Sequence, residues 1–181
     1  NLMDIKPRLL ILARAITGES IEIYEAEREG GYKNANFFLP TRFVEFSSAE
    51  ENISFYTFRV LYLSVQKNLD LNWNDNIEHE LFESQQRAEE TSKLVLDSLF
   101  EQFPISKKYY NSFIKFYTEK QKNNNLKDFS FIYGKWMRNN PEETSEETLQ
   151  NFTEKVKKAD EEKPKTILKS NAVEEIISVQ V

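Results

Sequence analysis

The chain's single histidine, His79, lies between Glu78 and Glu80, a run whose side chains could ligate a cation or transfer protons. Helical zinc and di-iron sites need at least two histidines at fixed spacing, and this chain has only one. It has no cysteine, which excludes thiolate metal sites, disulfides and a cysteine nucleophile. We therefore interpret the Glu-His-Glu run as an exposed helix start.

The motifs of the common catalytic sites are also missing from the sequence. It contains neither G-x-x-x-x-G-K-[ST] nor G-x-G-x-x-G, so no phosphate-binding loop is recognisable, and it has no G-x-S-x-G for a serine nucleophile. Glutamate pairs are abundant among the 30 acidic residues, and solvated helix faces explain them. We expect no enzymatic activity, and a carboxylate-based hydrolase or metalloenzyme is the least favoured alternative.

Residues 107–138 form a basic stretch with aromatic residues between the cations. Its cations are Lys107, Lys108, Lys115, Lys120, Lys122, Lys127, Lys135 and Arg138. This pattern is the best case for a helical module that binds nucleic acid. However, the aromatic residues repeat at the spacing of a core face, and the net charge of −6 opposes general phosphate binding. We keep nucleic-acid binding as an alternative and expect no nucleic-acid partner.

Arg59 is the most unusual charged residue, because it lies in a strongly apolar segment beside Phe55, Tyr62 and Leu63. An unpaired buried cation typically costs about 3–5 kcal/mol, so we predict a buried side chain bonded to a carboxylate. The candidate partners are Glu22, Glu25, Glu27, Glu29 and Glu45. Such a pair is either structural, fixing a hairpin to a helix, or part of a partner-binding or switching site.

Composition and capping signals predict a mainly α fold of five or six helices. Gly (4) and Pro (5) are scarce, which favours long helices over turn-rich β folds. Ser48 and Glu51 form a capping box for a helix from Ala49 to about Leu69. The other expected helices run from an Asp4 cap to Gly18, over 77–103, from a Ser106 cap through the basic stretch, over 129–137, and from an Asn140 cap to about Ala159.

A small β-hairpin or sheet is predicted near the N-terminus, from residues near 21–27 and 36–46. Residues 21–27 start with alternating apolar and charged residues, which is typical of a half-buried strand. Gly30 and Gly31 indicate a turn, and residues 36–40 are the expected returning strand.

The domain division and location follow from the ends of the chain and its hydropathy. We expect one helical domain over 1–159, then a linker and the start of a strand over 160–181. No apolar run is long enough for a membrane span, and the N-terminus lacks the order of a signal peptide. These features predict a cytoplasmic protein.

Three segments together resemble the N-terminal region of the nitric oxide reductase activation protein NorD and related von Willebrand factor A (VWA) proteins. They are "PRLLILARAITG" (7–18), "AEREGGYKNANFFLP" (26–40) and "ENISFYTFRVLYLSVQ" (51–66), in that order. The resemblance covers roughly residues 6–70. The combination of A-E-R-E-G-G with F-F-L-P and F-R-V-L-Y-L is its most specific part.

The resemblance implies a chaperone-like adaptor that works with a MoxR-type AAA+ ATPase and activates a client enzyme, such as nitric oxide reductase, by remodelling or metal insertion. In that family a C-terminal VWA domain binds a divalent metal through D-x-S-x-S. This sequence contains no D-x-S-x-S, so we expect no metal or other cofactor in it and assign no ligand. The chain then corresponds to the domain that precedes the VWA domain.

Exposed charged residues and a turn tip are the expected contacts for the ATPase or for the client, including a membrane-bound client. The candidates are Arg28 and Tyr32 at the predicted hairpin tip, and Lys115, Lys122 and Lys127 on the basic stretch.

Overall fold

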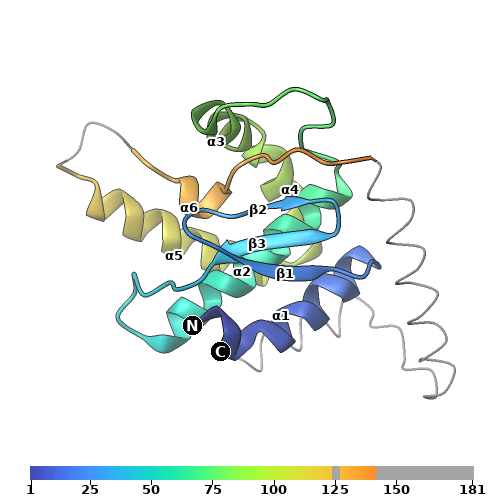
Figure 1. Cartoon of the computed structure of the whole chain (residues 1–181). Coiled ribbons are helices and arrows are strands. Elements are labelled where there is room, and N and C mark those ends of the chain that lie inside the picture. The colour runs from blue at the N-terminus through green and yellow to red at the C-terminus, as the bar shows by residue number, and fades with distance from the viewer. Residues whose placement is uncertain (124–126, 142–181) are drawn as a thin grey trace, which may run out of the picture.

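The computed structural model describes residues 1–123 and 127–141, which form six helices and one small sheet (Figure 1). The mainly helical architecture with a small N-terminal sheet is therefore confirmed. The helices are α1 (Leu2–Thr17), α2 (Ala49–Asn68), α3 (Leu81–Glu90), α4 (Ser92–Gln102), α5 (Ile105–Lys120) and α6 (Ser130–Tyr133). The predicted helix that ends near residue 159 and the segment 160–181 lie outside the described residues.

Helix α2 is the centre of the fold and contacts α1, α4, α5 and the sheet. Every residue from Phe55 to Gln66 is buried, as the apolar run in the sequence requires. The predicted N-cap is confirmed, since the Ser48 hydroxyl accepts a hydrogen bond from the Glu51 N–H at 3.1 Å. In Figure 1, α2 passes behind the sheet, so the sheet and the surrounding helices share one core.

The sheet has the predicted location but a different topology. Its strands are β1 (Glu22–Ala26), β2 (Gly31–Lys33) and β3 (Asn36–Pro40), in the order β1-β3-β2. Strands β1 and β3 are parallel, so β3 is not the returning strand of a hairpin with β1. The tight turn joins β2 to β3 through Asn34, whose φ is 52°, while Gly31 belongs to β2. Asparagine adopts this left-handed conformation more readily than most residues. The turn predicted at Gly30 and Gly31 is therefore wrong, and the turn lies at Asn34 instead.

Two predicted helices are broken or shortened. The expected helix over 77–103 starts at Leu81 and breaks at Thr91, whose hydroxyl donates to the Arg87 carbonyl at 2.8 Å. Threonine competes in this way for backbone groups, and no glycine or proline marks the break. The expected helix over 129–137 is only α6, because Gly134 ends it and the chain is extended from there to Asn140.

Two predicted caps are also wrong. The N-cap of α1 is Asn1, whose side chain accepts from the Met3 N–H, and Asp4 lies inside the helix. Helix α5 starts at Ile105, so Ser106 is in its first turn and donates to the Phe103 carbonyl at 2.6 Å. By contrast, the C-terminal end of α1 at Gly18 is confirmed, with φ of 69°.

The extended residues 134–140, here called the clasp segment, tie distant parts of the chain together. Its backbone N–H groups bond to acceptors in three different places: Lys135 to Gly30 O, Trp136 to Ser84 O, Met137 to Asn72 Oδ1, Asn139 to Trp73 O and Asn140 to Asn34 Oδ1. Figure 1 shows this segment, in orange, passing between β2 and α3. The clasp segment thus holds the sheet, the α2–α3 connection and α3 in one arrangement.

Among the described residues, none of the helices has the length and apolar character needed to cross a membrane.

Gly134 is a position where a side chain cannot be accommodated. Its φ of 71° and ψ of −148° are essentially restricted to glycine, and an added Cβ would overlap with Arg59 Nη2 and the Gly30 carbonyl oxygen. We predict that Gly134→Ala lowers the free energy of unfolding by about 3 kcal/mol or more. Gly18→Ala is the matched control, because Gly18 also has positive φ but has free space around it, and should cost about 1–2 kcal/mol. Equal losses in urea unfolding would contradict the proposed packing at Gly134.

Candidate functional site

Arg59 is fully buried, as predicted, but it bonds to a carbonyl group rather than to a carboxylate. Its exposure is 0%, and its Nη1 donates to the Ile132 carbonyl oxygen at 2.7 Å. Nε and Nη2 have no hydrogen-bond partner, and the guanidinium carbon lies 5.1 Å from the centre of the Tyr62 ring. Ile132 is in the last turn of α6, where helix carbonyls lack intrahelical partners, so the arginine satisfies one of them.

The predicted direct ion pair of Arg59 is therefore wrong, and the five candidate carboxylates have other surroundings. Glu22 pairs with Arg14 at 2.9 Å, Glu45 pairs with Lys120, and Glu25 and Glu27 are exposed. Only Glu29 is buried. The sequence identified the acidic residues, but it did not show that Arg14 and Lys120 pair with two of them instead of Arg59.

Burial lowers the pKa of Arg59 to about 10, while Tyr62 and Glu29 act in the opposite direction. Arg59 is consequently still charged at neutral pH. Glu29 contributes through the electrostatic attraction between unlike charges, without a hydrogen bond to the guanidinium. Glu29, one of the predicted partners, thus interacts with Arg59 through its charge, but it is not hydrogen-bonded to the guanidinium as predicted.

Glu29 also supports a surface groove. Its side chain is 1% exposed, its Oε1 accepts from Gln85 Nε2 at 2.9 Å, and its Oε2 lies 3.4 Å from Arg28 Nε. Both Gln85 and Arg28 line the groove. One buried carboxylate therefore fixes two groove residues from different elements, the β1–β2 connection and α3.

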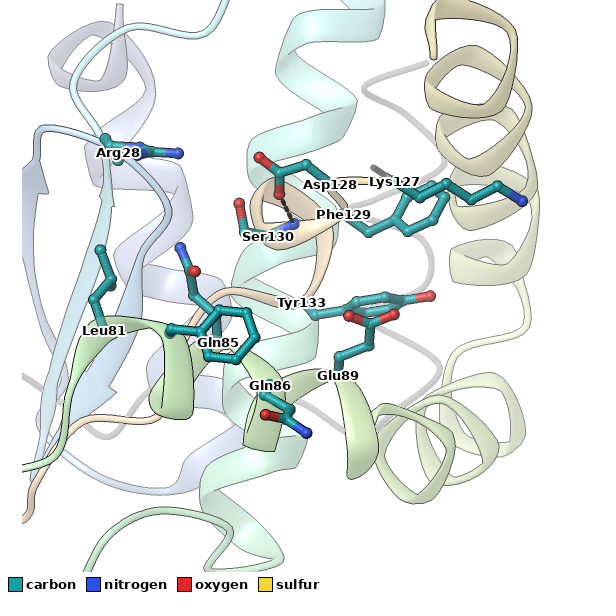
Figure 2. Close-up of a pocket in the computed structure, with 11 residues that line it drawn as sticks. Arg28, Leu81, Gln85, Gln86, Glu89, Lys127, Asp128, Phe129, Ser130 and Tyr133 are labelled. Atoms are coloured by element: carbon teal, nitrogen blue, oxygen red, sulfur yellow. Dashed lines mark hydrogen bonds between the residues drawn. The ribbon is translucent and has the colours of Figure 1, made fainter. Parts of the chain in front are cut away.

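The groove, here called the α3 groove, has a volume of about 310 Å³. It lies between α3, the β1–β2 connection and the chain around the start of α6 (Figure 2). Its lining comprises Arg28, Leu81, Phe82, Gln85, Gln86, Glu89, Lys127, Asp128, Phe129, Ser130 and Tyr133. Large apolar side chains on its α3 side face solvent, since Phe82 is 75% and Leu81 47% exposed.

Two of the five predicted contact residues meet in this groove. Arg28 and Lys127 are exposed and both line it, although they are far apart in the sequence. Lys115 and Lys122 are exposed but lie outside the groove. Tyr32 was wrongly placed at a turn tip, because it belongs to β2 and is 1% exposed, against the core.

Phe82 and Leu81 are the groove residues that the sequence analysis missed as contacts. Both residues fall within the helix expected over 77–103, in which no contact residue is predicted. The available signal was Phe82 itself, which falls outside the apolar stripe of its own helix, where Ser84 and Ala88 are the buried residues. A single exposed aromatic residue is common on protein surfaces, and Phe82 gains significance from the exposed Ile77 and Leu81 close to it.

His79 makes a compact cluster in a second hollow, which contains Leu81, Trp136 and Met137. Its ring stacks on Trp73 with centroids 3.7 Å apart, Nε2 lies 2.9 Å from Asp75 and Nδ1 3.2 Å from Glu83. Both ring nitrogens are thus occupied by carboxylates, and no group of potential metal ligands was found in the described residues. The predicted exposed helix start is corrected, since His79 precedes α3 and its side chain is only 12% exposed.

The aromatic residues of the basic stretch are mostly turned inward, as predicted. Tyr109, Phe113 and Tyr117 are buried, and Tyr110 and Phe116 are half-buried. These rings are packed in the core and are not available to stack on bases. Base stacking by these aromatic residues therefore no longer supports the nucleic-acid alternative.

No family model, curated protein or solved structure matches this chain. The candidate site is the α3 groove, which has exposed apolar residues on one side, opposite charges in its lining and a buried carboxylate beneath it.

We predict that Arg59→Met changes the free energy of unfolding by less than about 1 kcal/mol. Methionine fills most of the volume, and removing a desolvated cation offsets the lost bond to Ile132. Arg59→Ala leaves a cavity as well and should cost about 3–5 kcal/mol in urea unfolding. If Arg59→Met were as destabilising as Arg59→Ala, the charge itself would be essential to the fold.

His79 should make stability depend on pH near neutrality. Desolvation lowers its pKa, but the hydrogen bonds to Asp75 and Glu83 outweigh this effect and raise it above 6.5. Its stabilising effect is fully present below about pH 6.5 and is lost as pH rises through the folded-state pKa. Melting temperatures from pH 5.5 to 8.5 should show this decline in the wild type and a flatter profile in His79→Gln. A parallel decline in both proteins would exclude His79 as the group responsible.

Proposed function

We propose that this chain is a non-catalytic protein-interaction domain, the adaptor part of a VWA-type protein that works with a MoxR-type AAA+ ATPase. The observation that supports it best is Phe82, 75% exposed at the edge of the α3 groove. A large aromatic side chain held on a helix beside a groove is a typical anchor for a partner protein.

The surroundings of Phe82 support a docking surface of useful size. Ile77 is 63% exposed and Leu81 47%, and both lie just before or at the start of α3. Leu81 lines the α3 groove, the His79 hollow and a third hollow beside β1. Three neighbouring hollows around exposed apolar side chains are what a partner needs to exclude water on binding.

The resemblance to NorD-type proteins suggests who the partners are. On this proposal the domain binds the ATPase ring or the client enzyme in the cytoplasm, and the metal-dependent contact belongs to a VWA domain. The client is of the nitric oxide reductase kind, activated by remodelling or metal insertion. Steering charges near the groove, Arg28 and Lys127, fit such a role because they influence encounter rates.

A matched pair of substitutions tests the docking surface. Phe82→Asp should weaken binding of the full chain to its MoxR-type ATPase at least tenfold, because hot-spot aromatic residues typically contribute 2 kcal/mol or more. Leu94→Asp is the control, since Leu94 is 59% exposed on α4 and lines none of the three hollows. Binding is measured by surface plasmon resonance, with circular dichroism to verify folding.

The same assay separates the α3 groove from the rest of the basic surface. Lys127→Glu, in the groove, should weaken binding more than Lys115→Glu or Lys122→Glu, which lie outside it. Undiminished binding in Phe82→Asp and Lys127→Glu would exclude this surface as the ATPase site. Full ATPase binding and client activation after deletion of the whole domain would refute the adaptor role.

A further inference from the structure

We infer that residues 142–159 pack as an amphipathic helix on the outer face of the sheet and close the hollow beside β1. The side chains that face the sheet are Leu149, Phe152 and Val156. The inference is independent of the proposed function, because the hollow beside β1 does not include Phe82. It assigns a partner from the same chain to a surface that the described residues leave open.

The outer face of the sheet carries a row of apolar side chains across its three strands. Tyr24 pairs with Phe38, and Phe38 pairs with Gly31, so the three residues lie side by side on one face. The rings of Tyr24 and Phe38 stack with their centroids 5.7 Å apart, and Tyr24 is 49% exposed. Met137 takes the place of a side chain at Gly31, since its Cγ lies 3.0 Å from the position of an added Cβ.

None of the described helices covers this row. In Figure 1, α2 lies behind the sheet, and none of the six helices lies in front of the face that is turned toward the viewer. The opposite face is complete, because Ile23, Phe37 and Tyr32 are buried in the core. Parallel strands such as β1 and β3 are normally covered on both faces, so the exposed row needs a second layer.

The described residues end at Pro141, beside one end of the sheet. The Asn140 N–H bonds to Asn34 Oδ1 at 3.1 Å, and Pro141 and Asn34 line the same hollow. Asn34 forms the turn between β2 and β3, so residues 142–181 continue from this turn. A segment that starts there needs no long connection to reach the outer face of the sheet.

The length of the segment fits the sheet. The sequence predicts a helix over 140–159. Phe38 is four residues beyond Asn34, which is about 13 Å at 3.3 Å per residue, and a helix covers this distance in about nine residues. Leu149 and Phe152 therefore arrive at the stacked aromatic rings.

The far end of the sheet carries an excess of carboxylates. Glu25 and Glu27 line the hollow beside β1, are exposed and form no ion pair within residues 1–123 and 127–141. Two cations line the same hollow, but Arg28 lies 3.4 Å from the buried Glu29. Lys135 alone therefore faces the two remaining carboxylates.

The basic residues of the segment reach this acidic end. The end of β1 is about 20 Å from the Asn34 turn, a distance that a helix covers in about 13 residues. Lys155 and Lys157 thus come close to the carboxylates, and the attraction between unlike charges favours this position. The hollow at the Asn34 end contains one cation and one carboxylate, Lys67 and Asp70, and favours neither charge.

Photocrosslinking from residue 152 of the full chain tests the inference. With p-benzoylphenylalanine in place of Phe152, irradiation should join this residue to peptides of β1 or β3 in the same molecule, which mass spectrometry identifies. The same group in place of Gln150, which lies off the apolar face of the predicted helix, should give at least tenfold less of this crosslink. Crosslinks to other elements, or between two molecules, overturn the inference.

Thiol labelling gives a second readout, because the chain has no cysteine of its own. Ala26→Cys places a thiol in the hollow beside β1. Its labelling should become at least tenfold faster when Phe152→Asp is added and should stay unchanged with Gln150→Asp. Leu94→Cys, at an exposed position on α4, should react equally fast in all three backgrounds. Equal labelling of Ala26→Cys in all three backgrounds overturns the inference, and circular dichroism verifies that each variant is folded.

Discussion

The fold is organised around a cation that has almost no polar partners. Arg59 occupies the middle of α2 with a single hydrogen bond, to the Ile132 carbonyl, and two of its nitrogens are unpaired. Burying a charge with so few hydrogen bonds costs free energy, which the packing around Arg59 must offset. The neighbours accordingly have little freedom: Gly134 has no room for a side chain, and α6 ends where its carbonyl meets the guanidinium.

Glu29 connects this interior to the surface. It favours the charged form of Arg59 while contacting Arg28 and Gln85, which line the α3 groove. The core and the groove therefore share the carboxylate of Glu29. A substitution of Arg59 or of a groove residue bound to Glu29 changes the surroundings of this carboxylate. The clasp segment reinforces this connection. Its Lys135 N–H bonds to the carbonyl of Gly30, next to Glu29, and its Trp136 N–H bonds to the carbonyl of Ser84, next to Gln85. A rigid base of this kind suits a surface that binds without reorganising.

The sequence predicted features that depend on neighbouring residues. The Ser48 cap, the end of α1 at Gly18 and the burial of Arg59 follow from local spacing, and all three are confirmed. Features that depend on distant residues were missed. The partner of Arg59 is a backbone carbonyl, which no side-chain pattern reveals, and Tyr32 is buried because of what packs over β2. Half of the site was predictable for the same reason: Arg28 and Lys127 are recognisably exposed charges, whereas the place of Phe82 beside a groove depends on α6, a distant segment that packs against α3.

The long sequence separation between Arg59 and its acceptor has a consequence for the order of events during synthesis. The two residues are 73 positions apart, so α2 leaves the ribosome well before the carbonyl that will receive its guanidinium. At roughly 5–20 residues per second, the delay is about 4–15 s. The buried environment of Arg59 cannot be completed during that interval, because Ile132 supplies its one hydrogen bond and Gly134 packs against its guanidinium.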